Sequence, residues 1–118
     1  MSCHLLALCI DANDSIRLAG FWAGVLAWEV TDDPRDGIAL LPSDDTGFRI
    51  RFLPTRERKV GQNQLHFDLT STSLENQQQT VARSLALGAG HIDIGQTEAN
   101  SVVMADPDGN EFGVWSRQ

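Results

Sequence analysis

Seven residues on predicted β-strands carry side chains that can do chemistry. Imidazole and carboxylate groups transfer protons or bind metal ions, paired arginines hold a carboxylate or a phosphate, and an indole stacks on a ring. The seven are His4, Arg49, Arg51, His66, Asp68, Glu111 and Trp115. Charged groups are costly to bury without partners, so a sheet face that carries them is predicted to line a wet cleft rather than a core.

The first half of the chain is predicted to form a strand, a helix and three more strands. The apolar run at residues 1–10 indicates a buried strand. Asn13 or Asp14 can cap a helix that reaches about Ala27, because apolar residues such as Ile16 and Trp22 recur there at helical spacing. The further strands are predicted at residues 28–30, 38–41 and 48–52.

The second half repeats this order. A helix begins at a capping box of Thr72 and Glu75, with Ser73 as the competing cap, and ends at Gly88. This helix carries its apolar residues at Leu74, Val81 and Leu85. The strands are predicted at residues 64–69, 91–94, 101–105 and 110–115.

A constant shift of 62 positions superimposes the two halves, placing His4 on His66 and Arg51 on Gly113. An internal repeat of this kind indicates a duplicated unit, the alternative being coincidence between two ordinary βαβββ stretches. Within each strand, side chains alternate between the two faces. We therefore assign the seven chemical residues to one face, and the apolar residues, with Cys3 and Cys9 as core filler, to the face that the helix covers.

Composition narrows the class of protein. The 118 residues include 16 Asp and Glu against 9 Lys and Arg, a net charge of −7, which argues against a nucleic-acid partner. The early apolar run is too short for a bilayer, so no membrane association is expected. Cys3 and Cys9 would lie about 20 Å apart along one strand, too far to pair, and reduced cysteines favour a cytoplasmic protein.

Several segments together resemble the vicinal oxygen chelate superfamily, which holds glyoxalases, bleomycin-resistance proteins and extradiol dioxygenases. The similarity is greatest to small glyoxalase-like domain proteins. The most specific segment is the turn Asp106-Pro107-Asp108-Gly109-Asn110, and the chain departs from the pattern at Ala27, where glycine is usual. The other segments are residues 8–11, 21–26, 65–69, 87–89 and the remainder of 104–112.

The resemblance implies an α+β fold in which two βαβββ modules form a curved mixed sheet around an open cleft, commonly in a homodimer. The whole chain is then one domain, with modules at residues 1–53 and 64–118 joined by a linker at 54–63.

In metal-dependent members of the superfamily, ligands come from the first and last strand of each module, which we place at His4, Arg51, His66 and Gly113. Arginine and glycine offer no side-chain ligand, so the metal site is predicted to be incomplete and no cofactor is expected. If a divalent metal ion does bind, the set to test is His4, His66 and Glu111.

Three functions follow from these residues. The first is binding of a small molecule through Arg49, Arg51, Asp68 and Trp115, with drug binding of the bleomycin-resistance kind as one form. The second is a glyoxalase-like lyase or a dioxygenase that uses the metal set, or a metal-free proton transfer by His66, Asp68 or Glu111. The third is a non-catalytic regulatory domain that kept the fold.

Overall fold

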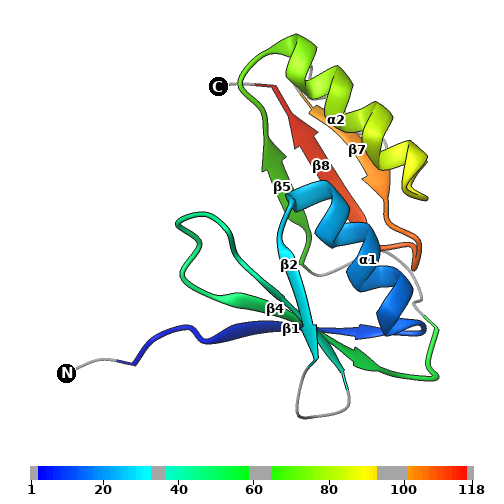
Figure 1. Ribbon diagram of the computed structural model, residues 1–118. Coiled ribbons are helices and arrows are strands. Elements are labelled where there is room, and N and C mark those ends of the chain that lie inside the picture. The colour runs from blue at the N-terminus through cyan, green and yellow to red at the C-terminus, as the bar shows by residue number, and fades with distance from the viewer. Residues whose placement is uncertain (1–2, 33–36, 59–64, 93–100, 117–118) are drawn as a thin grey trace. The chain divides into compact units, whose positions relative to one another are not determined.

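The computed structural model describes residues 3–32, 37–58, 65–92 and 101–116 (Figure 1). The chain divides into two compact units, Met1–Arg58 and Lys59–Gln118. Their boundary falls within the predicted linker, of which residues 59–63 lie outside the described residues. Residue 64 and residues 93–94 of the predicted strands likewise lie outside the described residues.

Unit 1 is a four-stranded mixed sheet with one helix. Its strands lie in the order β1-β4-β3-β2, with β1 parallel to β4 and the other neighbours antiparallel. The helix α1 packs on one face of this sheet (Figure 1). In chain order the elements are β1 Ala7–Ala12, α1 Ser15–Leu26, β2 Glu29–Asp32, β3 Ile38–Leu41 and β4 Arg49–Pro54.

The helix α1 begins and ends for identifiable reasons. The side chain of Asp14 accepts a hydrogen bond from the backbone N–H of Arg17 and caps the first turn. At the other end Ala27 adopts a left-handed conformation with φ 59° and ψ 39°. Trp22 is buried, as its spacing predicts. The same spacing places Ile16 on the buried side of the helix, and this prediction is wrong, because Ile16 is 75% exposed.

Unit 2 repeats the architecture, so the predicted α+β fold of two βαβββ modules is confirmed. Its strands lie in the order β5-β8-β7-β6, again with one parallel pair, β5 and β8. The remaining neighbours are antiparallel. In chain order the elements are β5 Phe67–Thr70, α2 Leu74–Ala86, β6 Gly90–His91, β7 Ser101–Ala105 and β8 Glu111–Trp115.

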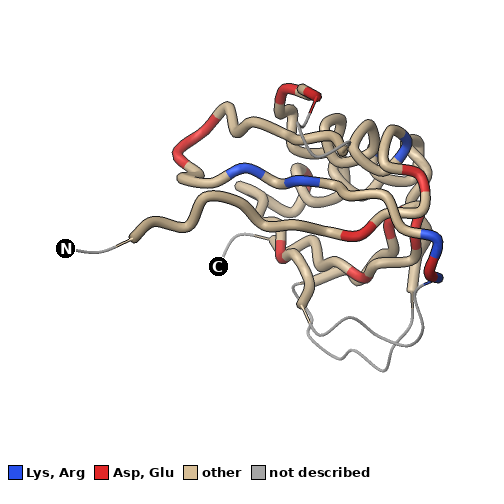
Figure 2. Tube along the Cα trace, turned by 90° about the horizontal axis from the view of Figure 1, so that it is seen from below, with Lys and Arg blue, Asp and Glu red and all other residues tan. Residues whose placement is uncertain are grey.

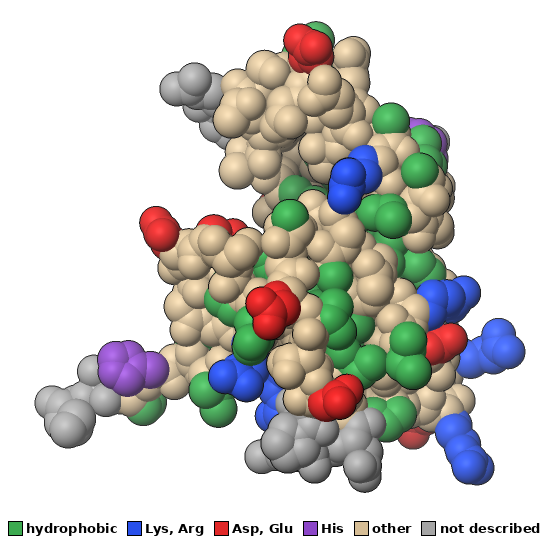
Figure 3. Space-filling view, in the orientation of Figure 1, with side chains coloured by type: hydrophobic (Ala, Val, Ile, Leu, Met, Phe, Trp, Pro, Cys, Tyr) green, Lys and Arg blue, Asp and Glu red, His purple; other side chains and the backbone are tan. Residues whose placement is uncertain are grey.

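The fully buried residues of the helix α2 are polar, Gln77 and Ser84. Its cap is Ser73, whose hydroxyl accepts from the N–H of Asn76, and Gly88 follows its end with φ 117°. The predicted apolar side of α2 is wrong for Leu74 and Leu85, which are 63% and 40% exposed, whereas Val81 is half-buried. Gln77 is buried and donates a hydrogen bond of 2.8 Å to the carbonyl oxygen of Val114. Apolar side chains consequently reach the surface between polar ones (Figure 3).

The first strand differs most from its prediction. It begins at Ala7 rather than at residue 1, and residues 3–6 are exposed and form no regular element. In the sheet, Ile10 pairs with the buried Phe52, whereas Cys9 pairs with Arg51 on the opposite face. Cys9 and Cys3 are both exposed, so their prediction as core residues is wrong.

The register of the two sheets also corrects the repeat. The last strands do correspond with a shift of 62, since Ile50 and Phe112 occupy equivalent places. In the first strands, however, Leu8 pairs with Ile50 and Phe67 pairs with Phe112, so Leu8 corresponds to Phe67 with a shift of 59.

The helix caps agree with this second value, because Asp14 and Ser73 are also 59 positions apart. The residue in unit 1 that corresponds to His66 is therefore Ala7, and the pairing of His4 with His66 by the repeat is wrong.

Candidate functional site

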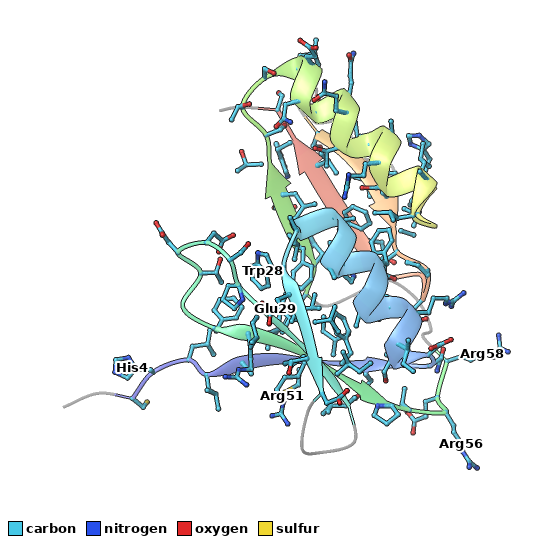
Figure 4. The ribbon with its side chains drawn as sticks, viewed as in Figure 1. His4, Trp28, Glu29, Arg51, Arg56 and Arg58 are labelled. Atoms are coloured by element: carbon cyan, nitrogen blue, oxygen red, sulfur yellow. The ribbon has the colours of Figure 1, made fainter. Side chains whose placement is uncertain are left out.

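The two arginines of β4 lie on the face of the unit 1 sheet that α1 does not cover. Ile50 and Phe52 are buried toward α1, and strand alternation directs Arg49 and Arg51 the other way. Figure 4 shows Arg51 on the side of the sheet away from α1. We call this surface, formed by Ala7, Cys9, Ala39, Arg49 and Arg51, the arginine face.

Small neighbours make room for the guanidinium groups. Arg51 lies between Cys9 of β1 and Ala39 of β3 in the register, and Arg49 lies beside Ala7. Only 9% of Arg51 is exposed, and its Nη1 lies 4.0 Å from the Cys9 sulfur. A guanidinium withdrawn from water attracts an anion more strongly than one in bulk solvent. The arrangement suits recognition of a carboxylate or a phosphate, which arginine binds with paired hydrogen bonds.

His4 lies apart from this arrangement. It precedes β1, is exposed, and lies on the N-terminal segment that Figure 4 shows leading away from the sheet. The backbone of that segment still joins β4, because the carbonyl oxygen of Leu6 accepts from the N–H of Arg49 at 3.1 Å. Strand alternation does not extend to His4, since the regular strand begins only at Ala7.

In unit 2, three of the predicted site residues meet around Gly113. Asp68 pairs with Gly113 across β5 and β8, and the Oδ1 atom of Asp68 lies 3.2 Å from Nε2 of His66. A Cβ atom at Gly113 would lie 2.8 Å from the same oxygen and 3.1 Å from Nε1 of Trp115. The carboxylate and the indole edge therefore occupy the space that a side chain at this position would fill. We call His66, Asp68, Gly113 and Trp115 the Gly113 cluster.

The backbone beneath this cluster is held in place at its end. The carbonyl oxygen of Trp115 accepts from both the backbone N–H and the hydroxyl of Ser71, which is buried. On the opposite face of the strand, Gln77 of α2 binds the carbonyl of Val114. Residue types alone did not reveal the space over Gly113, although a glycine inside a predicted strand is itself a signal of close approach.

The donor set does not fit the metal site that the superfamily implies. With the corrected register, Ala7 is the unit 1 equivalent of His66 and Arg51 is the equivalent of Gly113, and of these four residues His66 alone offers a side-chain ligand. Nε2 of His66 is next to Asp68, and the described residues contain no group of three or more His, Cys, Asp or Glu that could hold a metal ion. Glu111 lies two residues before Gly113 on β8, and the set of His4, His66 and Glu111 stays a prediction.

A second polar arrangement, which the sequence did not predict, lies at the turn after β3. Nε1 of Trp28 donates to Oδ2 of Asp44 at 3.2 Å, and the backbone N–H of Thr46 donates to Oδ1 at 2.9 Å. The Thr46 bond is the largest cause that lowers the pKa of Asp44 from its ordinary value of 3.8, since it favours the charged form. Because Trp28 is buried and held by this bond, it acts in packing.

Acidic positions are spread over both units (Figure 2), in keeping with the net charge of −7. Neither helix in the described part of the chain has the length and apolar character to cross a membrane. Because the chain as a whole is acidic, the arginines of β4 stand out as a local positive charge.

Solved structures with this fold include proteins of the glyoxalase/bleomycin resistance/dioxygenase group, the vicinal oxygen chelate superfamily. A hypothetical protein from S. aureus, SA1046, is 12% identical, with a TM-score of 0.76 over 99% of this chain and 95% of that one. A glyoxalase/bleomycin resistance protein/dioxygenase family enzyme from Burkholderia phytofirmans is 17% identical, with a TM-score of 0.75 over 93% and 95%. The fosfomycin resistance protein FosX from Listeria monocytogenes is 15% identical, with a TM-score of 0.73 over 98% and 91%.

At these identities the similarity concerns the fold. A comparison with curated proteins gave no match. The glyoxalase-like domain family matches residues 7–115, nearly the whole chain, and the chain belongs to that family.

Proposed function

We propose that this glyoxalase-like protein binds a small organic anion, a carboxylate or a phosphate ester, on the arginine face, and that binding requires no metal ion. The observation that carries the proposal is the placement of Arg49 and Arg51 on one face of β4, beside the small residues Ala7, Cys9 and Ala39. Side chains two apart on a strand are separated by about 7 Å, which lets two guanidinium groups converge on one anionic group.

The charge of the protein does not oppose this assignment. The chain carries a net charge of −7, but at physiological salt charges more than about 8 Å apart are largely screened. The anion would therefore respond chiefly to the two guanidinium groups next to it.

The metal-dependent alternative has less support in the residues. Oxidase, dioxygenase and fosfomycin resistance appear in the names of structural neighbours and describe those proteins. Of Ala7, Arg51, His66 and Gly113, which the register makes equivalent in pairs, His66 alone carries a ligating side chain. Among the predicted proton-transfer residues, His66 and Asp68 are in contact with each other, whereas Glu111 lies two residues before Gly113 on β8.

Calorimetric titration with benzoate and phenyl phosphate in the presence of EDTA tests the proposal. We expect saturable binding that weakens about 10-fold to 100-fold in Arg51→Gln, because a hydrogen bond to a charged group contributes roughly 1.5–3 kcal/mol. Arg56→Gln removes the same charge from an exposed position beyond β4 and is the matched control.

Arg51→Lys separates a folding defect from a binding defect, because it keeps the charge and loses the planar fork. We expect this variant to fold normally and to bind less tightly than the parent. Equal affinity in the parent, Arg51→Gln and Arg56→Gln would overturn the proposal.

A further inference from the structure

A carboxylate borders the arginine face on strand β1. Asp11 is exposed, and the next residue along the strand, Ala12, is fully buried. Since side chains alternate along a strand, Asp11 points to the same side of the sheet as Cys9, which pairs with Arg51 of β4. The side of the sheet that α1 leaves uncovered therefore carries a negative group as well as two positive ones.

The spacing keeps this carboxylate apart from the guanidinium groups. Asp11 lies two residues beyond Cys9, about 7 Å along the strand. Nη1 of Arg51 lies 4.0 Å from the Cys9 sulfur, and Arg49 lies farther from Asp11, beside Ala7. The Asp11 side chain forms no hydrogen bond or ion pair with any described residue. Opposite charges thus stand within reach of one small ligand without being paired with each other.

The surface between the charges leaves room for the body of a ligand. On β1 the residue between Asp11 and Ala7 that shares their face is Cys9, whose side chain is short and exposed. On β3 the neighbour of Arg51 is Ala39, which is equally small. A spacer between two charged groups can therefore lie over Cys9 while its ends reach Arg51 and Asp11.

Asp11 changes which anions this face favours. About 7 Å is within the screening length of roughly 8 Å at physiological salt, so the carboxylate repels a ligand that carries negative charge alone. A ligand that also carries an ammonium group at that distance is attracted instead, because the ammonium donates charge-assisted hydrogen bonds to the carboxylate. The arrangement discriminates between simple anions and zwitterions.

We propose that the preferred ligand of the arginine face is a zwitterion, with an ammonium group at the opposite end from its carboxylate or phosphate, and that Asp11 determines this preference. The inference rests on the proposed anion site and names its ligand class. Arg49 and Arg51 bind the anionic end, the spacer lies over Cys9, and Asp11 accepts hydrogen bonds from the ammonium.

Two probes of nearly equal size separate the effect of charge from that of shape. 4-(Aminomethyl)benzoate and 4-ethylbenzoate share the ring and the carboxylate, and an ammonium group in the first replaces a methyl group in the second. Each is titrated calorimetrically against the parent protein at pH 7 and physiological salt in the presence of EDTA. We expect 4-(aminomethyl)benzoate to bind at least about 10-fold more tightly, because only its ammonium can donate to Asp11. Equal affinities would overturn the inference.

Two substitutions assign the preference to one carboxylate. Asp11→Asn removes the charge and keeps the size, so we expect it to bind both probes about equally tightly. Its affinity for 4-ethylbenzoate should not fall, which also shows that the variant is folded. Asp45→Asn removes the same charge from an exposed position in the turn after β3 and should keep the full preference. An unchanged preference in Asp11→Asn, or an equal loss of preference in Asp45→Asn, would overturn the inference.

The same titrations separate this inference from the anion proposal on which it rests. If the parent binds both probes equally and both weaken in Arg51→Gln, the zwitterion preference is wrong and the anion site stands. If neither probe binds, or if Arg51→Gln leaves both affinities unchanged, the anion site is wrong and the zwitterion preference fails with it.

Discussion

Substituting Gly113 by alanine tests whether the space above this residue is filled by side chains that can move. The new Cβ would lie 2.8 Å from the Asp68 carboxylate and 3.1 Å from the Trp115 indole, so at least one of them must shift. Both atoms are the ends of side chains. The main loss is the contact between Asp68 and His66, whose side chains are 52% and 55% exposed.

The expected effect on stability is small. An exposed pair of this kind contributes about 0.2–1 kcal/mol, and replacing a strand glycine by alanine regains about 0.5–1 kcal/mol of backbone entropy. We therefore expect Gly113→Ala to change the free energy of unfolding by less than about 1 kcal/mol.

Gly37→Ala provides the opposite case. There the new Cβ would collide with the backbone carbonyl oxygen of Phe52, which cannot rotate away, and we expect destabilisation of about 2 kcal/mol. Gly90 in β6 faces open space, so Gly90→Ala should change stability by less than about 0.5 kcal/mol. Urea unfolding of the three variants gives the comparison. If Gly113→Ala proved as destabilising as Gly37→Ala, the space above Gly113 would be rigidly packed and our description of the cluster would be wrong.

Two further predictions concern unit 1. Ala27 adopts a left-handed conformation that costs a residue with a Cβ about 1–2 kcal/mol. Ala27→Gly should therefore raise the free energy of unfolding by about 0.5–1 kcal/mol, whereas Ala23→Gly inside α1 should lower it by about 1 kcal/mol. A loss of stability in Ala27→Gly would contradict this explanation. The Thr46 N–H holds the pKa of Asp44 below 3.8, so the folded state favours its charged form, and the resulting stability is complete above that value and lost as the pH falls through the lowered pKa. The melting temperature of the parent should exceed that of Asp44→Asn at pH 6, and the difference should shrink at pH 3. A difference that stays constant with pH would count against this explanation, as would an equal loss of melting temperature in Asp45→Asn.

The sequence predicted the fold because its strongest local signals agree with the tertiary structure. The cap at Asp14, the stop at Gly88 and the alternating β4 are each determined by neighbouring residues, and each lies where predicted. The turn from Asp106 to Asn110 is similar, since the carboxylate of Asp106 accepts from the N–H groups of Asp108 and Asn110.

The sequence did not predict the register of the first strand. The apolar run at residues 1–10 has no signal that separates its exposed beginning from its paired end, and only the pairing of Leu8 with Ile50 decides it. That pairing moved the counterpart of His66 from His4 to Ala7. A shift of three positions also changes the face of every side chain, because the side-chain period of a strand is two.

The side of α2 that packs on the sheet was hidden for a different reason. Gln77 is buried because its amide binds the Val114 carbonyl, an interaction that apolar periodicity does not register. Leu74 and Leu85 are exposed in its place. Hydrophobic spacing fails where a helix packs through hydrogen bonds. The common face of His66, Asp68 and Trp115 was predicted, but their approach over Gly113 was not, because it depends on side-chain positions across two strands.

Metal dependence of anion binding tests the central claim most directly. The protein is stripped with EDTA, its metal content is measured by mass spectrometry, and benzoate affinity is determined before and after addition of Zn²⁺, Mn²⁺ or Fe²⁺. We expect far less than one metal ion per chain in the stripped protein and the same benzoate affinity throughout. One tightly held metal ion per chain that His66→Ala removes, or benzoate binding that appears only after metal is added, would contradict the account.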